Sequence, residues 1–134
     1  MINVGESILS LSDFNEIVYK DKGVELDKKA VEKVDESYNF LKSFSSNKLI
    51  YGINTGFGPM AQYKVSEENL LQLQYNLIRS HTSGFPNYID NSNCKAVFIA
   101  RLNSLIRGHS SVRTDLINHM VSMYNNEIIP CIPI

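Results

Sequence analysis

Residues 51–60 combine a tyrosine with three glycines and a proline, and they form the segment best suited to chemistry. The run reads YGINTGFGPM. Glycines let the backbone approach a ligand and move, and a phenol can donate or accept a proton. Because a free tyrosine has a pKa of about 10, a base role near neutral pH requires positive charge or hydrogen-bond donors nearby. One interpretation is therefore a mobile active-site loop that carries Tyr51.

Two other interpretations of this loop compete with the first. Phosphate binding is disfavoured, because neither Gly-x-Gly-x-x-Gly nor Gly-Lys-Ser/Thr occurs here. The next predicted helix also opens with Glu67 and Glu68, which repel phosphate. A glycine loop that crosses tightly over another element, with Tyr51 merely packed, stays open at this point.

The rest of the pattern is mainly helical and predicts the scaffold that positions the loop. Helices are predicted over 13–20, 27–44, 66–81, 91–107 and 114–124. Apolar residues recur at intervals of three and four, as at Val31, Val34, Tyr38 and Leu41. Residues 24–26 and the opening residues up to 9 are short extended candidates. The predicted fold class is mainly α, with one or two very short strands.

Caps and buried faces complete these predictions. Ser10 or Ser12, Ser66 and Thr114 are the predicted N-caps, and glycines are expected to stop two helices. The stopping residues are Gly23 and Gly108. Leu70, Leu73 and Leu77 form a predicted buried stripe. The next helix has an apolar face of Val97, Phe98, Leu102 and Leu105, and the last helix runs through Leu116, Ile117, Met120, Val121 and Tyr124.

Composition excludes several classes of protein. The chain has 134 residues, a size that suits one domain or part of a larger one, and a net charge of −1 without a basic block. Nucleic acid is therefore not expected as the main partner. No run approaches the ~20 apolar residues of a membrane span, and no leader is visible, so we expect a soluble cytoplasmic protein.

Cysteines and histidines give no metal-like spacing. Cys94 and Cys131 are predicted to be free, buried thiols. The three histidines are scattered along the chain, so no metal site is expected. Arg107 and His109 stand near a predicted helix end, where cations suit the helix dipole, and are interpreted as structural. His119 is interpreted as a surface or packing residue.

Three ordered blocks of sequence carry a family resemblance. They are YGINTGFG at 51–58, LQLQYNLIRSHTSG at 71–84 and LNSLIRGHSSVR at 102–113. Together they resemble the histidine, phenylalanine and tyrosine ammonia-lyases. The resemblance covers about residues 30–134, and the first residues more loosely. Three blocks in family order are far more specific than one short motif.

The resemblance implies a long helical enzyme with the fumarase/aspartase-like fold, of which residues 1–134 are an incomplete N-terminal domain. Such enzymes are homotetramers that eliminate ammonia from L-histidine to give urocanate, or from L-tyrosine to give coumarate. Their electrophile, a 4-methylideneimidazol-5-one ring (MIO), forms from an Ala-Ser-Gly triad of the chain, without an added cofactor. No Ala-Ser-Gly occurs in this sequence, and the central helical bundle is also absent, so we expect these residues to be inactive alone.

The resemblance also implies roles for particular residues. Tyr51 is the base that removes the β-proton, and Ser80 and His81 contact the substrate side chain. Gly58 brings a backbone amide near the substrate. Asn54 and Thr55 are instead expected to hold the shape of the loop through bonds to its backbone.

His81 leaves the substrate open. Without the family, it is interpreted as a histidine at a helix C-terminus. Ser80-His81 resembles histidine lyases, whereas the surrounding residues 58–63 and 76–84 also resemble tyrosine lyases. A neutral histidine can hydrogen-bond an imidazole or a phenol, and an apolar phenylalanine ring would leave a buried polar pair unmatched.

Two alternative functions stay open. An aminomutase of the same family shares the loop and returns the ammonia to the β-carbon. A non-catalytic helical domain that serves only interaction would explain the missing Ala-Ser-Gly. Apolar faces that await the missing bundle lead us to expect an oligomer in solution.

Overall fold

The computed structural model describes residues 1–5, 7–85 and 87–134. The chain divides into two compact units. Unit 1 comprises residues 1–40 and 86–134, and unit 2 comprises residues 41–85. The long helix α2 (Lys28–Phe44) begins in unit 1 and ends in unit 2.

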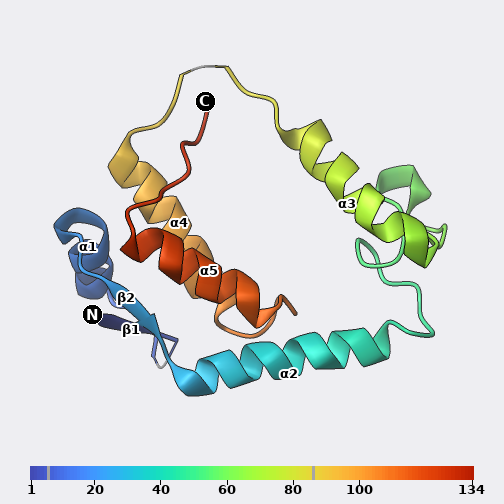
Figure 1. Ribbon diagram of the computed structural model, residues 1–134, viewed down its shortest axis with the longest axis horizontal. Helices are drawn as coiled ribbons and strands as arrows, with labels where there is room; N and C mark the ends of the chain where they lie inside the picture. The colour runs from blue at the N-terminus through green and yellow to red at the C-terminus, as the bar shows by residue number, and fades with distance from the viewer. Residues whose placement is uncertain (6, 86) are drawn as a thin grey trace. The chain divides into compact units, whose positions relative to one another are not determined.

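Unit 1 consists of helices around a small parallel strand pair. Its further elements are β1 (Ile2–Val4), α1 (Leu11–Lys20), β2 (Val24–Leu26), α4 (Asn91–Leu105) and α5 (Thr114–Asn125). β1 pairs with β2 in parallel, with Ile2 opposite Val24. Helix α4 packs against α1 and α5, and α5 also contacts β2 (Figure 1). The prediction of a mainly helical fold with two very short strands is confirmed.

The start of α1 follows from a capping box. Asp13 N donates to Ser10 Oγ at 3.1 Å, and Ser10 N donates to Asp13 Oδ2 at 3.1 Å. The Ser10 hydroxyl and backbone amide hold the pKa of Asp13 below its usual range. Ser10 is therefore the cap, and Ser12 lies inside the helix. The helix ends at Asp21, whose φ of 51° is left-handed, so the prediction that Gly23 stops it was wrong.

The start of α4 is fixed in a similar way. Asp90 is its N-cap and accepts a bond from Asn93 N at 2.8 Å. The Ser92 hydroxyl, followed by the Asn93 amide, holds the pKa of Asp90 below its usual range. The predicted start at Asn91 is confirmed. Helix α5 differs, because Arg113 occupies the cap position and the predicted cap, Thr114, is the first helical residue.

The core of unit 1 is formed by side chains from both strands and from α1, α2, α4 and α5. Its buried members are Val4, Ile17, Val24, Ala30, Val34, Ile99, Leu102, Leu105, Ile106, Ile117, Met120 and Tyr124. Two polar ties cross this core. Tyr124 OH donates to the Ile17 carbonyl at 2.6 Å, and the Asn125 side chain bonds both the N–H and the carbonyl of Val24 at 2.9 Å. These ties fix α5 against α1 and β2.

One burial prediction in unit 1 was wrong. Val97 is 51% exposed, although it was predicted on the apolar face of its helix. Leu102 and Leu105 of that face are buried as predicted, together with Cys94 and Ile99. Periodicity groups residues on a helix but leaves a choice of face, which the neighbouring helices decide.

One of the two cysteines is buried and the other is exposed. Cys94 is buried and free as predicted, whereas Cys131 is exposed. The residues after Cys131 pair with residues 87–89, including the bond from Ile89 N to the Ile132 carbonyl at 3.1 Å. This pairing of extended segments leaves the Cys131 side chain outside the core.

Unit 2 contains the end of α2, an irregular loop and helix α3 (Glu67–His81). Ser66 is the N-cap of α3 by position, but its side chain makes no capping bond. None of the residues of α3, all of which the structure describes, is buried. The predicted stripe of Leu70, Leu73 and Leu77 is only half-buried, because unit 2 has little other chain to cover it. That prediction was therefore too strong.

Among the described residues, no helix combines the length and hydrophobicity needed to cross a bilayer.

Replacing Tyr124 by phenylalanine tests the tie between α5 and α1. We expect the Tyr124→Phe variant to lose about 1–3 kcal/mol of unfolding free energy at pH 7, because the buried Ile17 carbonyl loses its donor. Burial, with a smaller effect of Asp21, raises the pKa of the Tyr124 phenol. Its stabilising effect is therefore complete below the unfolded pKa of about 10 and is lost as the pH rises through the folded value.

Urea unfolding at pH 7 and above pH 10, followed by circular dichroism, measures both effects. The difference between the wild type and Tyr124→Phe should shrink at the higher pH. Tyr19→Phe is the matched control, since Tyr19 is 62% exposed. Equal losses in the two variants, or a difference that grows with pH, would contradict the expectation.

Candidate functional site

The amide of Asn54 holds the first half of the glycine-rich loop. Its Oδ1 accepts a bond from Ile50 N at 2.8 Å. Its Nδ2 donates to the carbonyls of Ser45 and Lys48 at 3.0 and 2.7 Å. Asn54 is only 8% exposed. One side chain thus satisfies three backbone groups that no helix or strand provides for.

The second half of the loop is closed by backbone pairing. Thr55 and Lys64 form an antiparallel bridge, Gly56 N donates to the Tyr63 carbonyl at 3.3 Å, and Val65 N donates to the Asn54 carbonyl at 3.0 Å. Thr55 is 1% exposed, and its hydroxyl donates to the Gly56 carbonyl at 3.0 Å. The prediction that Asn54 and Thr55 hold the loop through backbone bonds is confirmed.

Glycine is required at two positions of this loop. A Cβ on Gly56 would lie 2.6 Å from Met60 Cβ and 2.9 Å from the Met60 carbonyl oxygen, so no larger residue fits there. Gly58 starts the short 3₁₀ helix η1 (Gly58–Met60) with a φ of +55°, which favours glycine. A Cβ on Gly58 would meet nothing within 4 Å, so its backbone is open to an approaching molecule.

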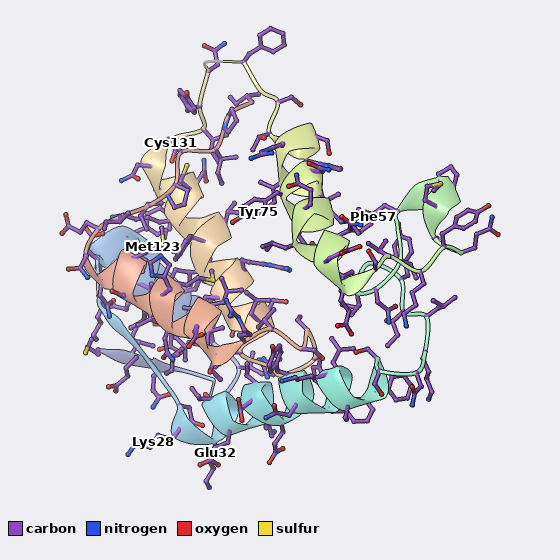
Figure 2. All side chains as sticks on the ribbon, turned by 45° about the vertical axis from the view of Figure 1, so that its right-hand side comes forward. Lys28, Glu32, Phe57, Tyr75, Met123 and Cys131 are labelled. Carbon is purple, nitrogen blue, oxygen red and sulfur yellow. The ribbon has the colours of Figure 1, made fainter. Side chains whose placement is uncertain are left out.

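Tyr51 projects from this anchored loop. It is 64% exposed, and its ring meets the Phe57 ring edge-on, with centroids 6.0 Å apart and an interplanar angle of 85°. Figure 2 labels Phe57 in the loop of unit 2. Among the described residues, none hydrogen-bonds the Tyr51 hydroxyl. Tyr51 is therefore not packed into the interior of unit 2.

Ser80 and His81 meet at the C-terminal end of α3. His81 Nδ1 lies 2.8 Å from the Leu77 carbonyl oxygen and 3.1 Å from Ser80 Oγ. Ser80 Oγ donates to the same carbonyl at 2.9 Å. Since a carbonyl only accepts, Nδ1 carries the hydrogen, and in the neutral form of the ring the lone pair then lies on Nε2. Both residues are exposed.

The structure brings some of the predicted residues together. Tyr51, Gly58, Ser80 and His81 all belong to unit 2, and Ser80 contacts His81 directly. Within the described part of unit 2, no hydrogen bond joins Tyr51 to either of them. His119 lies on α5 in unit 1 and is exposed. Of its two predicted roles, surface or packing residue, the structure shows the surface one.

Sequence reasoning missed two features of this site. The edge-on contact of Phe57 with Tyr51 carries no local signal, because both side chains are separated by five glycine-rich positions. The Ser45 and Lys48 carbonyls could not be identified as partners of Asn54, because every residue carries the same backbone carbonyl group. In the described residues, no group of three or more His, Cys, Asp or Glu is arranged to hold a metal ion.

The fold and the site define a class of protein: a helical domain that presents a tyrosine on a glycine-rich loop and a Ser-His pair at the end of the following helix. The sequence profile described as aromatic amino acid lyase matches residues 9–134. The chain belongs to the aromatic amino acid lyase family.

Individual relatives share this assignment but differ in name. The chain is 37% identical over 134 residues to a probable histidine ammonia-lyase of Thermoplasma acidophilum. The alignment covers 99% of this chain and 27% of the relative. The structure matches the phenylalanine aminomutase of Pantoea agglomerans with a TM-score of 0.90 and 30% identity, covering 99% of this chain and 26% of the other. It matches the tyrosine aminomutase of Streptomyces globisporus with a TM-score of 0.89 and 29% identity, covering 98% and 25%.

The chain thus spans about a quarter of the length of the curated relatives it matches. The resemblance stated from the three sequence blocks is confirmed at the level of the family, and so is the correspondence of the fold to part of these larger enzymes.

Removing the Asn54 amide tests what holds the loop. We expect Asn54→Ala to destabilise the loop by about 2–3 kcal/mol, because three hydrogen bonds of roughly 1 kcal/mol each are lost. Amide hydrogen exchange should accelerate over residues 50–65 and stay unchanged in unit 1. Asn76→Ala, an exposed amide on α3, is the control. Unchanged exchange at Ile50 and Val65 in Asn54→Ala would show that another contact holds the loop.

Proposed function

We propose that the chain is the N-terminal part of an enzyme that eliminates ammonia from L-histidine or L-tyrosine, with Tyr51 as the base. The observation that carries the proposal is the exposed phenol of Tyr51 on an anchored glycine-rich loop, in a member of the aromatic amino acid lyase family. Because the chain spans about a quarter of its relatives, the activity is proposed for the complete protein.

The chemistry needs a positioned base. The β-carbon of the substrate gives up a weakly acidic proton, its bond to hydrogen breaks, a carbon–carbon double bond forms, and ammonia departs from the α-carbon. General base catalysis of this kind contributes about 10²–10⁴-fold. A loop anchored at its base suits this role, since the phenol oxygen must come within hydrogen-bond reach of the proton.

The electrophile that the family resemblance implies does not fit these residues. MIO forms from Ala-Ser-Gly, and the 134 residues contain no such triad. The role of this chain is therefore limited to presenting Tyr51 and contacting the substrate. In the complete protein we propose that MIO comes from other residues, that the enzyme is a cytoplasmic homotetramer, and that its small-molecule partner is the aromatic amino acid.

His81, Ser80 and Gly58 are proposed to contact the substrate. Nε2 of a neutral His81 is free to accept a hydrogen bond from an imidazole N–H or a phenol O–H. The Gly58 backbone, open on its Cβ side, allows a close approach. Both histidine and tyrosine satisfy these groups, so the choice between them stays open.

An aminomutase is the second candidate. The tyrosine and phenylalanine aminomutases whose structures this chain resembles match it with TM-scores of 0.89 and 0.90. Such an enzyme would return the ammonia to the β-carbon. Incubating the complete protein with each amino acid and separating α,β-unsaturated acid from β-amino acid distinguishes the two. A protein with neither product and no Ala-Ser-Gly would instead be a non-catalytic interaction domain.

Tyr51→Phe in the complete protein tests the base. We expect kcat to fall by about 10²–10⁴-fold with little change in KM, because the ring stays and only the hydroxyl is lost. Absorbance of the conjugated product gives the rate. Tyr63→Phe, in the same loop and 55% exposed, is the matched control and should keep its activity. Near-normal turnover by Tyr51→Phe would remove Tyr51 from the mechanism.

His81→Leu in the complete protein tests the substrate contact. Loss of the ring nitrogen should lower kcat/KM for histidine and tyrosine by at least about tenfold, because the substrate's donor is left unpaired. The ratio for phenylalanine over these two substrates should rise. His119→Leu is the control. An unchanged ratio among the three amino acids would show that His81 does not contact the substrate ring.

A further inference from the structure

A recess of about 300 Å³ lies in unit 1, whereas the loop that carries Tyr51 belongs to unit 2. Gly5, Ala30 and Ile106 contribute its apolar lining, and the last two are 5% and 1% exposed. The backbone of Gly5 is tightly packed there, since a Cβ on it would lie 2.6 Å from Ala30 Cβ. The volume is at the lower end for ligand sites and suits a small molecule.

Three cationic side chains line the same recess. Lys29 and Lys33 stand one turn apart on α2, and Arg107 follows the C-terminal end of α4. Their proximity is enforced by close backbone packing. Gly108, with a φ of +74°, fits against α2 so closely that a Cβ on it would lie 3.1 Å from the Lys33 carbonyl oxygen. Arg107 is therefore fixed beside Lys33.

A second contact fixes the same connection on α2. The hydroxyls of Ser37 and Ser111 are 2.9 Å apart and hydrogen-bonded. Because Ser111 follows Arg107 closely in sequence, the segment that bears Arg107 is held at two points along α2. The three cations thus meet through the fold, although more than 70 residues separate the lysines from the arginine.

The charges around the recess are unbalanced. Asp27 is the only carboxylate among its described lining residues, and its Oδ1 accepts a bond from Ala30 N at 2.9 Å at the start of α2. Within the described residues, the ion pairs involve Lys20, Lys22 and Lys95, and none involves the three cations of the recess. Three cationic side chains thus face one carboxylate, and that carboxylate is engaged at the start of α2. The lining of the recess is therefore electropositive.

We propose that this recess binds a small multivalent oxyanion, of which inorganic phosphate is the simplest example. Arginine offers two parallel donors to such an anion, and lysines add point charges. A long polyanion fits less well. Glu32, Asp35 and Glu36 line another hollow on α2 and would repel an anion that extended there.

Titrating the 134-residue chain with phosphate tests the site. At constant ionic strength of about 0.15 M, backbone amide signals of residues 29–33 and 105–108 should shift and saturate. Lys33→Gln combined with Arg107→Gln should weaken binding by at least about tenfold, because charge-assisted hydrogen bonds are lost. Phosphate should also raise the Tm of the wild type more than that of the double variant.

Lys28→Gln is the matched control, since it removes one charge from the same turn of α2 without touching the recess. Lys28 and Glu32 lie on the exposed surface at the start of this helix (Figure 2). We expect less than about a twofold change in its affinity. Circular dichroism confirms that each variant is folded. Shifts that do not saturate, or equal weakening by Lys28→Gln, would overturn the proposal, as would a double variant that is folded and binds like the wild type.

Discussion

The irregular loop of unit 2 depends on one constraint: backbone groups outside helices and strands still need hydrogen-bond partners. The Asn54 amide meets this constraint for Ile50, Ser45 and Lys48, and a short antiparallel pairing meets it for the residues that follow. Gly56 allows the chain to turn where any side chain would collide with Met60. The loop is consequently a defined structure rather than a free tether, and Tyr51 projects from a fixed base. Such anchoring is what the proposed role of Tyr51 as a base requires.

Unit 1 solves a different problem, which is to build a core from short elements. Strands of three residues cannot be stable alone, and β1 and β2 are stabilised because helices cover them and α5 bonds β2 through Asn125. Tyr124 adds a bond to α1 across the same core. The connection between α4 and α5 packs against α2 at Gly108, and the electropositive recess is a consequence of that packing. The unit therefore combines a conventional apolar core with a polar feature that no single element contains.

The two proposed sites differ in how much of their environment this chain supplies. The recess in unit 1 has its apolar lining and its charges within the described residues. By contrast, Tyr51 and His81 stand on exposed surface, and the apolar residues Leu71 and Ile78 on α3 are 67% and 61% exposed. A catalytic base works best where water is excluded and charges are fixed. The proposed lyase chemistry therefore depends on further groups that cover this surface in the complete protein.

The sequence by itself determined the features that are local. Helical periodicity, the Ser10 cap, the Asn54 and Thr55 bonds and the three family blocks could all be predicted, because each depends on neighbouring residues. Tertiary structure alone decided which helix face is buried. Val97 and Leu116 are exposed, and the α3 leucines are only half-buried, because burial depends on partners that are distant in sequence. It also brought Arg107 to Lys29 and Lys33, since a glycine far along the chain packs against the α2 backbone, and no local pattern encodes that contact.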